Sequence, residues 1–254
     1  MLQVDLSGKK ALVTGSSTGI GRAIALAFAR NGADVAVNYL RSKEAAEEVA
    51  HQIEEMGRKA VVVQADVSRK DEVEHLFAEV EAAFGPTLDI LVNNAGSLIR
   101  RELIAEMSEE TFDRVVAVNF KSVFLCSQAA IPRLPDGTGR VINISSIAAR
   151  NGGGPGASVY ASSKAAVSCF TKGLAKELAP RGITVNAIAP GVIATPFHER
   201  FSTPEIMERF RQNTPLGRNG VADDIVGAAL YLVSPEASFT TGETIEVNGG
   251  MLMD

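Results

Sequence analysis

The sequence is poor in the residues that build disulfide frameworks and metal sites. Its 254 residues include two cysteines, three histidines and no tryptophan. Cys126 and Cys169 lie in apolar helical patterns without CxxC spacing, which predicts buried free thiols rather than a disulfide framework or a zinc site. His51, His75 and His198 are scattered along the chain, so we expect no metal-binding cluster.

Basic charge and long apolar runs are lacking as well. Lys and Arg number 25 against 30 Asp and Glu, and the resulting net charge of -5 gives no basic field for nucleic acid. Residues 1–10 contain no apolar signal-peptide core, and no stretch reaches the roughly eighteen apolar residues of a membrane helix. The sequence therefore predicts a cytoplasmic protein that binds neither nucleic acid nor membrane.

Short β-branched runs alternate with longer helical patterns along the chain. Near-continuous apolar runs predict seven strands, at 11–14, 34–38, 60–64, 89–93, 140–144, 184–188 and 244–247. Apolar residues spaced three and four apart predict helices at 19–31, 43–56, 70–84, 109–134, 158–179 and 222–233. This succession predicts an α/β fold with a Rossmann-type, doubly wound, seven-stranded parallel sheet and helices on both faces. We expect one dinucleotide-binding catalytic domain over 1–254.

A glycine-rich turn joins the first predicted strand to the first predicted helix. Gly15 is expected to make the tight turn, Gly19 to let the main chain approach a pyrophosphate, and Gly21 to let the helix pack on the strand. The free N–H groups and the dipole at the helix N-terminus favour phosphate. The same turn contributes the further candidate cofactor-binding residues Ser17, Thr18 and Ile20.

The glycine spacing, Gly-x-x-x-Gly-x-Gly, resembles the short-chain dehydrogenase/reductase family, and the resemblance extends over nearly the whole chain. Asn93-Asn94-Ala95-Gly96 is similar to the sheet-stabilising and cofactor-lining motif of that family. Asp66-Val67 is similar to its adenine-contacting pair. Three further segments also match: Pro190-Gly191 with Ile193 and Thr195, which resembles the turn holding the nicotinamide carboxamide; Thr241-Gly242; and 247–250 in the last strand.

The resemblance implies an oxidoreductase that transfers a hydride between a nicotinamide ring and a carbonyl or secondary alcohol. It also implies a homotetramer, since members of this family are typically tetrameric. The segment at about 194–218 is expected to form a substrate lid. His198 falls within this lid and is a candidate substrate contact.

Tyr160 and Lys164 form Tyr-x-x-x-Lys and share one face of a predicted helix, for which Ser158 is the expected N-cap. A phenol titrates near pH 10, so proton exchange near neutrality needs a lowered pKa, which a nearby ammonium favours. The resemblance implies that Lys164 also binds the nicotinamide ribose and that Tyr160 protonates the carbonyl oxygen.

Two further residues complete the implied catalytic set. Ser146, at the carboxyl end of the fifth predicted strand, is expected to hold the substrate oxygen, and Ser145 is the alternative. Asn119 matches the family position that holds a water chain behind the lysine. A serine hydrolase is disfavoured, because its nucleophile would need a suitably placed His and the three histidines of this sequence are scattered.

Cofactor preference depends on the residues at the end of the second predicted strand. Cofactors without a 2'-phosphate are usually held there by a carboxylate, and this sequence has Asn38, followed by Tyr39. Arg41 and Ser42, with Lys43 after them, are candidate donors to a 2'-phosphate. The sequence therefore predicts a preference for NADP(H), with NAD(H) as a possible cofactor because Thr18 stands where many NADP-preferring relatives have an Arg.

The substrate is the least determined property. The segment 170–182, with Arg181, resembles 3-oxoacyl-(acyl-carrier-protein) reductases, in which an arginine at that place is suited to an acidic carrier. Asp136 and Gly137 stand where those reductases have basic residues, and 35–67 looks equally like bacterial glucose 1-dehydrogenases. A 3-oxoacyl-thioester reductase-like enzyme is the leading hypothesis, with a sugar or polyol dehydrogenase as the alternative. The remote alternative is a non-catalytic nucleotide sensor. Such a protein would be expected to lack Tyr160 or Lys164, and both are present.

Overall fold

The strands form a single parallel sheet in the computed structural model, which describes residues 4–253. The expectations for 1–10 and for a domain over 1–254 fall partly on residues outside this range. The strand order is β3-β2-β1-β4-β5-β6-β7, which confirms the predicted seven-stranded doubly wound sheet. The strands are β1 Lys10–Val13, β2 Asp34–Tyr39, β3 Ala60–Gln64, β4 Ile90–Asn93, β5 Arg140–Ile144, β6 Thr184–Pro190 and β7 Thr244–Val247.

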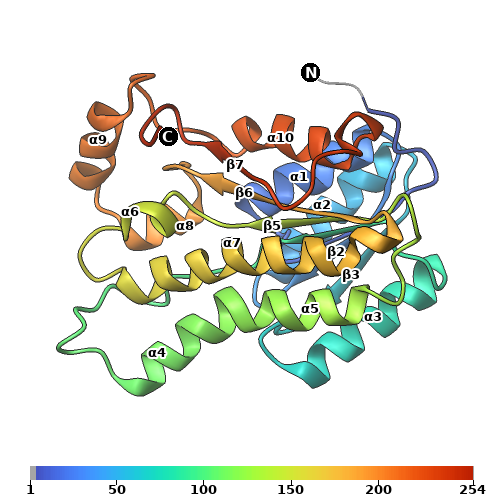
Figure 1. Cartoon of the computed structure of the whole chain (residues 1–254), viewed down its shortest axis with the longest axis horizontal. Helices are drawn as coiled ribbons and strands as arrows, with labels where there is room; N and C mark the ends of the chain where they lie inside the picture. Colours follow the sequence, from blue (N-terminus) through green and yellow to red (C-terminus); the bar gives the residue numbers. More distant parts are fainter. Residues whose placement is uncertain (1–3, 254) are drawn as a thin grey trace.

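Helices follow most of the strands and cover both faces of the sheet (Figure 1). They are α1 Gly19–Arg30, α2 Lys43–Glu55, α3 Lys70–Phe84, α4 Glu109–Val116, α5 Ser122–Ala130, α6 Ala148–Asn151, α7 Ser158–Leu178, α8 Pro196–Phe201, α9 Pro204–Asn213 and α10 Asp223–Val233. Short 3-10 turns occur at Ala179–Arg181 and Pro235–Ala237.

Two apolar cores lie on opposite faces of the sheet. One lies beneath α1, α2 and α10, and the other beneath α3, α5 and α7. In β1, Ala11 and Val13 belong to the first core and Leu12 to the second, because successive side chains of a strand point to opposite faces. Strands covered on both faces are apolar throughout, which explains the near-continuous runs in the sequence.

The carboxyl ends of the strands gather the segments that carry the candidate site. Figure 1 shows α6, α8 and α9 at this end of the molecule. The strand order reverses between β1 and β4, and doubly wound sheets bind ligands outside the carboxyl ends at such a point.

The prediction of one uninterrupted helix over 109–134 is wrong. A π-helical turn at Ala117–Lys121 separates α4 from α5, and α5 ends at Ala130. Asn119 accounts for the turn, because its Nδ2 donates to the Val115 carbonyl at 2.8 Å and so takes the acceptor of an α-helical N–H. Asn119 is also completely buried, with 0% of its surface exposed.

Two smaller expectations are also wrong. Ser158 is the first residue of α7 and makes no capping hydrogen bond, because Ala157 takes the N-cap position and its carbonyl accepts from the N–H of Ala161. Cys169 is exposed rather than buried. Cys126 is buried as expected, and burial raises the pKa of its thiol to about 12.

Gly21 offers a direct test of how α1 packs on the sheet. A Cβ at this position would lie 2.6 Å from the Gly15 carbonyl oxygen and even closer to the Asn94 amide nitrogen. We expect Gly21→Ala to lower the free energy of unfolding by about 1–3 kcal/mol, because the turn must move to admit the methyl group. Gly227→Ala in α10 is the matched control, since a Cβ there meets nothing within 4 Å. For that control the free energy of unfolding, measured by chemical denaturation, should rise by roughly 0.5–1 kcal/mol. Equal effects of the two variants would contradict the packing argument.

Candidate active site

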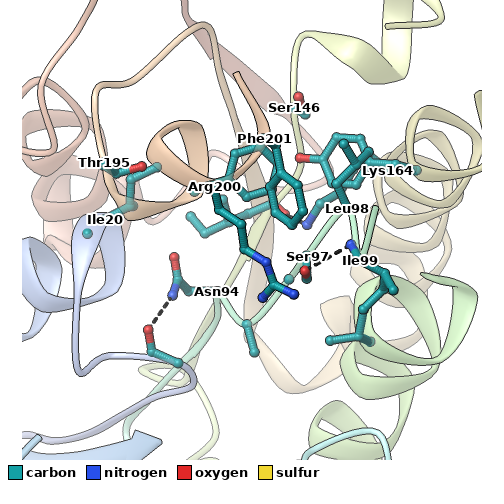
Figure 2. Close-up of a pocket in the computed structure, with 18 of the residues that line it drawn as sticks. Ile20, Asn94, Ser97, Leu98, Ile99, Ser146, Lys164, Thr195, Arg200 and Phe201 are labelled. Atoms are coloured by element: carbon teal, nitrogen blue, oxygen red, sulfur yellow. Dashed lines mark hydrogen bonds between the residues drawn. The ribbon is translucent and has the colours of Figure 1, made fainter. Parts of the chain in front are cut away.

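A cavity of about 1220 Å³ runs along the carboxyl edge of the sheet (Figure 2). Its wall includes the glycine turn, the ends of β2 to β6, the start of α7 and the helix α8. Most of the predicted site residues line it: Gly15, Ser17, Thr18, Gly19, Ile20, Asn38, Tyr39, Arg41, Ser42, Asp66, Val67, Ala95, Gly96, Ser146, Tyr160, Lys164, Pro190, Gly191, Ile193 and Thr195. Gly21, Asn93 and Asn119 are not among the residues that line it.

The glycine turn is shaped by positive φ angles and held by the loop after β4. Gly15 and Gly19 have φ of 60° and 58°, which glycine adopts without strain. The Asn94 side chain donates to the carbonyls of Thr14 at 2.9 Å and Gly15 at 3.0 Å. These bonds fix the turn from the side of the loop, so Asn94 is a site residue that the candidate set omitted.

Asn93 has a different position from the one expected for a cofactor-binding residue. Its side chain is buried and donates to Asn143 Oδ1 at 2.8 Å and Ser127 Oγ at 3.2 Å. Asn93 therefore joins β4 to β5 and α5, whereas Asn94 reaches the cavity wall. The strict alternation of side chains along a strand is the signal that separates the two residues.

Asn38 lines the cavity, but its side chain is turned into the protein. Its Oδ1 accepts from the Gly15 N–H at 3.0 Å, and its Nδ2 donates to the carbonyls of Val63 at 3.3 Å and Ala65 at 3.2 Å. The residue is 1% exposed. Asn38 therefore ties the glycine turn to β3, and the residues that follow it, Tyr39–Ser42, form the cavity wall at this place.

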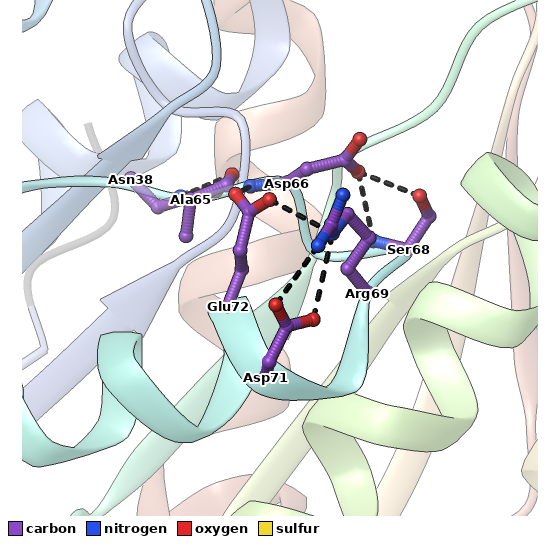
Figure 3. A network of polar contacts seen from close by, with 7 residues as sticks. All are labelled: Asn38, Ala65, Asp66, Ser68, Arg69, Asp71 and Glu72. Carbon is purple, nitrogen blue, oxygen red and sulfur yellow. Dashed lines mark hydrogen bonds and ion pairs between the residues drawn. The ribbon is translucent and has the colours of Figure 1, made fainter.

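Asp66 is held in a polar network at the start of α3 (Figure 3). Its Oδ1 accepts from the N–H and the hydroxyl of Ser68, at 3.0 and 2.6 Å. Its own N–H donates to Glu72 at 2.6 Å, while Arg69 pairs with Asp71 and Glu72. The carboxyl group is therefore fixed in one orientation at the cavity wall.

Lys164 is buried next to the end of β5. Its ammonium donates to the Ile144 carbonyl at 2.8 Å, and burial lowers its pKa to about 8. A Cβ on Gly96 would lie 3.1 Å from this ammonium and 2.8 Å from Asn119 Oδ1, so glycine is needed between them. Asn119 in turn binds both main-chain polar groups of Ser97, with Nδ2 2.7 Å from the carbonyl and Oδ1 3.1 Å from the N–H.

Tyr160 stands one turn before Lys164 on α7. Burial raises the pKa of its phenol, and a hydrogen bond with Ser146 acts in the opposite direction. The lowered pKa expected from the sequence is therefore wrong for this structure, since the Lys164 ammonium points to Ile144 and lies 5.9 Å from the centre of the phenol ring.

The two neighbouring serines have separate positions. Ser145 Oγ donates to the Lys164 carbonyl at 3.0 Å and lies 2.8 Å from Ser168 Oγ, so it ties β5 to α7. Ser146 faces Tyr160 and accepts from the Ala148 N–H at 3.1 Å. The geometry thus favours Ser146 as the hydroxyl that contacts a ligand beside Tyr160.

Helix α8 adds an aromatic wall that the sequence reasoning missed. The Phe197 ring centre lies 5.8 Å from that of Tyr160, and Phe201 lies 5.0 Å from Phe197. His198, on the same helix, lines the cavity and has Nδ1 2.9 Å from Ser202 Oγ. Burial, and secondarily the charge of Arg101, lower the pKa of His198 to about 4.

Within residues 4–253, no group of three or more His, Cys, Asp or Glu side chains is placed to hold a metal ion. No helix in the same range is long and apolar enough to cross a membrane.

The chain is similar to known proteins over nearly its whole length. Residues 15–252 match the family described as enoyl-(acyl carrier protein) reductase. A 3-oxoacyl-(acyl-carrier-protein) reductase of Staphylococcus aureus is 46% identical over 246 residues, which cover 96% of this chain and 98% of that protein.

Solved structures show the same fold. A short-chain dehydrogenase from Burkholderia cenocepacia in complex with NADP is 39% identical, with a TM-score of 0.91 and coverage of 97% of this chain and 98% of the other. A blue fluorescent protein from a metagenomic library in complex with NADPH is 36% identical, with a TM-score of 0.91 and coverage of 98% and 100%.

The contact between Ser146 and Tyr160 can be tested by titration. Ser146→Ala is expected to raise the pKa of Tyr160 further, because the hydrogen bond that lowers it is lost. Ser145→Ala is the matched control and should leave this pKa unchanged, since Ser145 binds Lys164 and Ser168 instead. The readout is the ultraviolet absorbance of the phenolate, with the spectrum of Tyr160→Phe subtracted. A Ser146→Ala titration that coincides with that of the wild type would contradict the assignment.

Proposed function

Because the chain belongs to the short-chain dehydrogenase/reductase family of oxidoreductases, we propose that it reduces 3-oxoacyl thioesters with a hydride from NADPH. The observation that carries this proposal is one cavity that has the glycine turn at its wall together with Ser146, Tyr160 and Lys164. The name of the Staphylococcus aureus relative and the NADP and NADPH complexes of the structural neighbours support the choice of substrate and cofactor.

The residues of the cavity fit a dinucleotide. The glycine turn and the N-terminus of α1 would bind the pyrophosphate, and Asp66 with Val67 would bind the adenine. Pro190, Gly191, Ile193 and Thr195 would hold the carboxamide, and Lys164 the ribose. When it is bound, the nicotinamide supplies the hydride.

The proton would come from Tyr160. Burial keeps the pKa of this phenol above its ordinary value, so the hydroxyl is protonated at neutral pH and suited to donate. A carbonyl that accepts a hydride becomes an alkoxide, which is more basic than a phenolate, so the proton moves downhill. Ser146 would hold the same oxygen, and Asn119 with Lys164 would position the groups that return a proton to Tyr160.

The cavity wall suits an acyl chain. Apolar side chains from three segments line it, among them Leu98, Phe197, Phe201 and Met251, and the Phe197 ring lies beside that of Tyr160. Contact with an acidic carrier protein through Arg181 is not favoured. Its Nε binds Asp136 at 2.7 Å, and its terminal nitrogens bind the carbonyls of Ile131 and Leu134. The proposal therefore concerns the thioester itself rather than recognition of a carrier at this surface.

The remaining features are proposals of the same kind. The segment 194–218 would be the substrate lid of a single catalytic domain, which the position of Phe197 beside Tyr160 supports. Exposed apolar side chains such as Phe112, Phe124 and Phe239 support association into a homotetramer. The cytoplasmic location stays a prediction from the sequence.

Substitution of Tyr160 tests the proposed function. Tyr160→Phe keeps the ring and removes the proton donor, so we expect kcat for a short 3-oxoacyl-coenzyme A thioester to fall by about 10²-fold or more. The measurement is NADPH consumption, run in parallel with glucose and polyols under NADP+ or NAD+. Near-normal turnover of the variant, or a wild type that oxidises sugars and leaves the thioester untouched, would reject the proposal.

Arg41 tests the cofactor preference. It is an exposed cation at the cavity wall just past β2, and a charge-assisted bond from it to a 2'-phosphate is worth about ten- to a hundredfold in affinity. We expect the wild type to favour NADP(H), and Arg41→Ala to reduce the ratio of kcat/KM for NADPH over NADH by about that factor. Lys43→Ala is the matched control, because Lys43 pairs with Glu47 at 3.5 Å and does not line the cavity. An Arg41→Ala variant with the wild-type ratio would show that Arg41 does not bind the phosphate.

A further inference from the structure

The loop after β4 contains a strained turn. Ile99 has a φ of 63°, and within residues 4–253 it is the one residue other than glycine with a positive φ. The Arg100 N–H donates to the Leu98 carbonyl at 2.7 Å, which closes a γ-turn with Ile99 at its centre. A β-branched residue rarely adopts this conformation, and such strain persists only where the surrounding contacts impose it.

Those contacts begin at the π-helical turn. The Ser97 hydroxyl accepts from the Ile99 N–H at 3.0 Å, as Figure 2 shows, and Asn119 holds the N–H and the carbonyl of Ser97. Because Asn119 is completely buried, the γ-turn is anchored to a rigid part of the molecule.

Past this turn, Arg101 bridges two segments that lie far from it in the sequence. Its Nε donates to the Phe201 carbonyl at 2.9 Å, and its Nη1 donates to the Pro155 carbonyl at 3.2 Å. Phe201 is the last residue of α8, and Pro155 belongs to the glycine-rich segment that precedes α7. One guanidinium therefore joins the loop after β4, the lid helix and the approach to the helix of Tyr160.

We propose that Arg101 is a positioning residue that holds α8 closed over the cavity. A helix of six residues is too short to be stable by itself, and its last carbonyls lack partners within the helix. Arg101 supplies a partner to one of them and places a positive charge at the C-terminus of the helix, where its dipole favours a cation. Closure matters for substrate binding because α8 carries Phe197, whose ring lies beside Tyr160 and forms part of the cavity wall.

Arg100 is the matched control. Its Nε pairs with Glu102 at 3.1 Å, and its Nη2 donates to the Thr111 hydroxyl at 2.8 Å. These contacts stay within its own loop and α4. Arg100 is exposed like Arg101, so Arg100→Gln removes a comparable guanidinium without releasing the lid.

Hydrogen exchange measures the closure without any substrate. We expect Arg101→Gln to speed the exchange of the α8 amides by about five- to tenfold, because the charge-assisted bond to Phe201 is lost. Arg100→Gln should leave those amides at the wild-type rate. Unchanged exchange in Arg101→Gln, or an equal increase in Arg100→Gln, would overturn the proposal. The hydrogen-exchange result does not depend on the identity of the substrate.

Steady-state kinetics distinguish a lid-holding role from a general loss of structure, because the two change KM and kcat differently. The inference rests on the proposed function here, since the lid is expected to cover the thioester. For Arg101→Gln, KM for the thioester should rise by about tenfold while kcat changes less than twofold, with Arg101→Lys in between because its single ammonium reaches one carbonyl more readily than two. A fall in kcat at unchanged KM would contradict a lid-holding role.

Discussion

The site depends on a buried ammonium held by a carbonyl oxygen. Lys164 is 3% exposed, and no ion pair is found for it within residues 4–253, so its charge is stabilised chiefly by the bond to the Ile144 carbonyl. Burial of a cation without a carboxylate is costly, which is why its pKa falls to about 8. Beside this group Gly96 must lack a side chain, because a Cβ there would lie 3.1 Å from the ammonium.

Burial favours the uncharged form of both Tyr160 and Lys164. It raises the pKa of the phenol and lowers that of the amine, so both groups are pushed toward their neutral forms. A neutral phenol is the form that can donate a proton to a substrate oxygen. The arrangement therefore suits the reduction of a carbonyl, with Ser146 adjusting the phenol from one side.

The sequence was sufficient for those features that depend on local pattern. Runs covered on both faces identified the strands, and the glycines of the first turn predicted the edge of the sheet along which the cavity runs. Helical spacing placed Tyr160 and Lys164 on one face of a helix, and their roles were implied by the family resemblance. Each of these signals lies within a few residues of chain, so it can be read without knowledge of distant contacts.

The features that were missed depend on competition or on distant contacts. The break at Asn119 arises because a side-chain amide takes a helical acceptor, which periodicity does not reveal. Asn38 follows the strand pattern, yet the glycine turn and the end of β3 both bind its amide and turn it inward. The Phe197 wall and the Arg101 bridge join residues far apart in the chain, so no local pattern contains them.

Transfer of an isotopic label tests the central claim most directly. NADPH carrying deuterium at both C4 positions of the nicotinamide is incubated with the protein and a short 3-oxoacyl-coenzyme A thioester, and the product is examined by mass spectrometry. The account predicts one deuterium on the carbon of the former ketone, with the hydroxyl proton taken from water. Consumption of the cofactor with a product that carries no deuterium, or no reduced thioester at all, would contradict it.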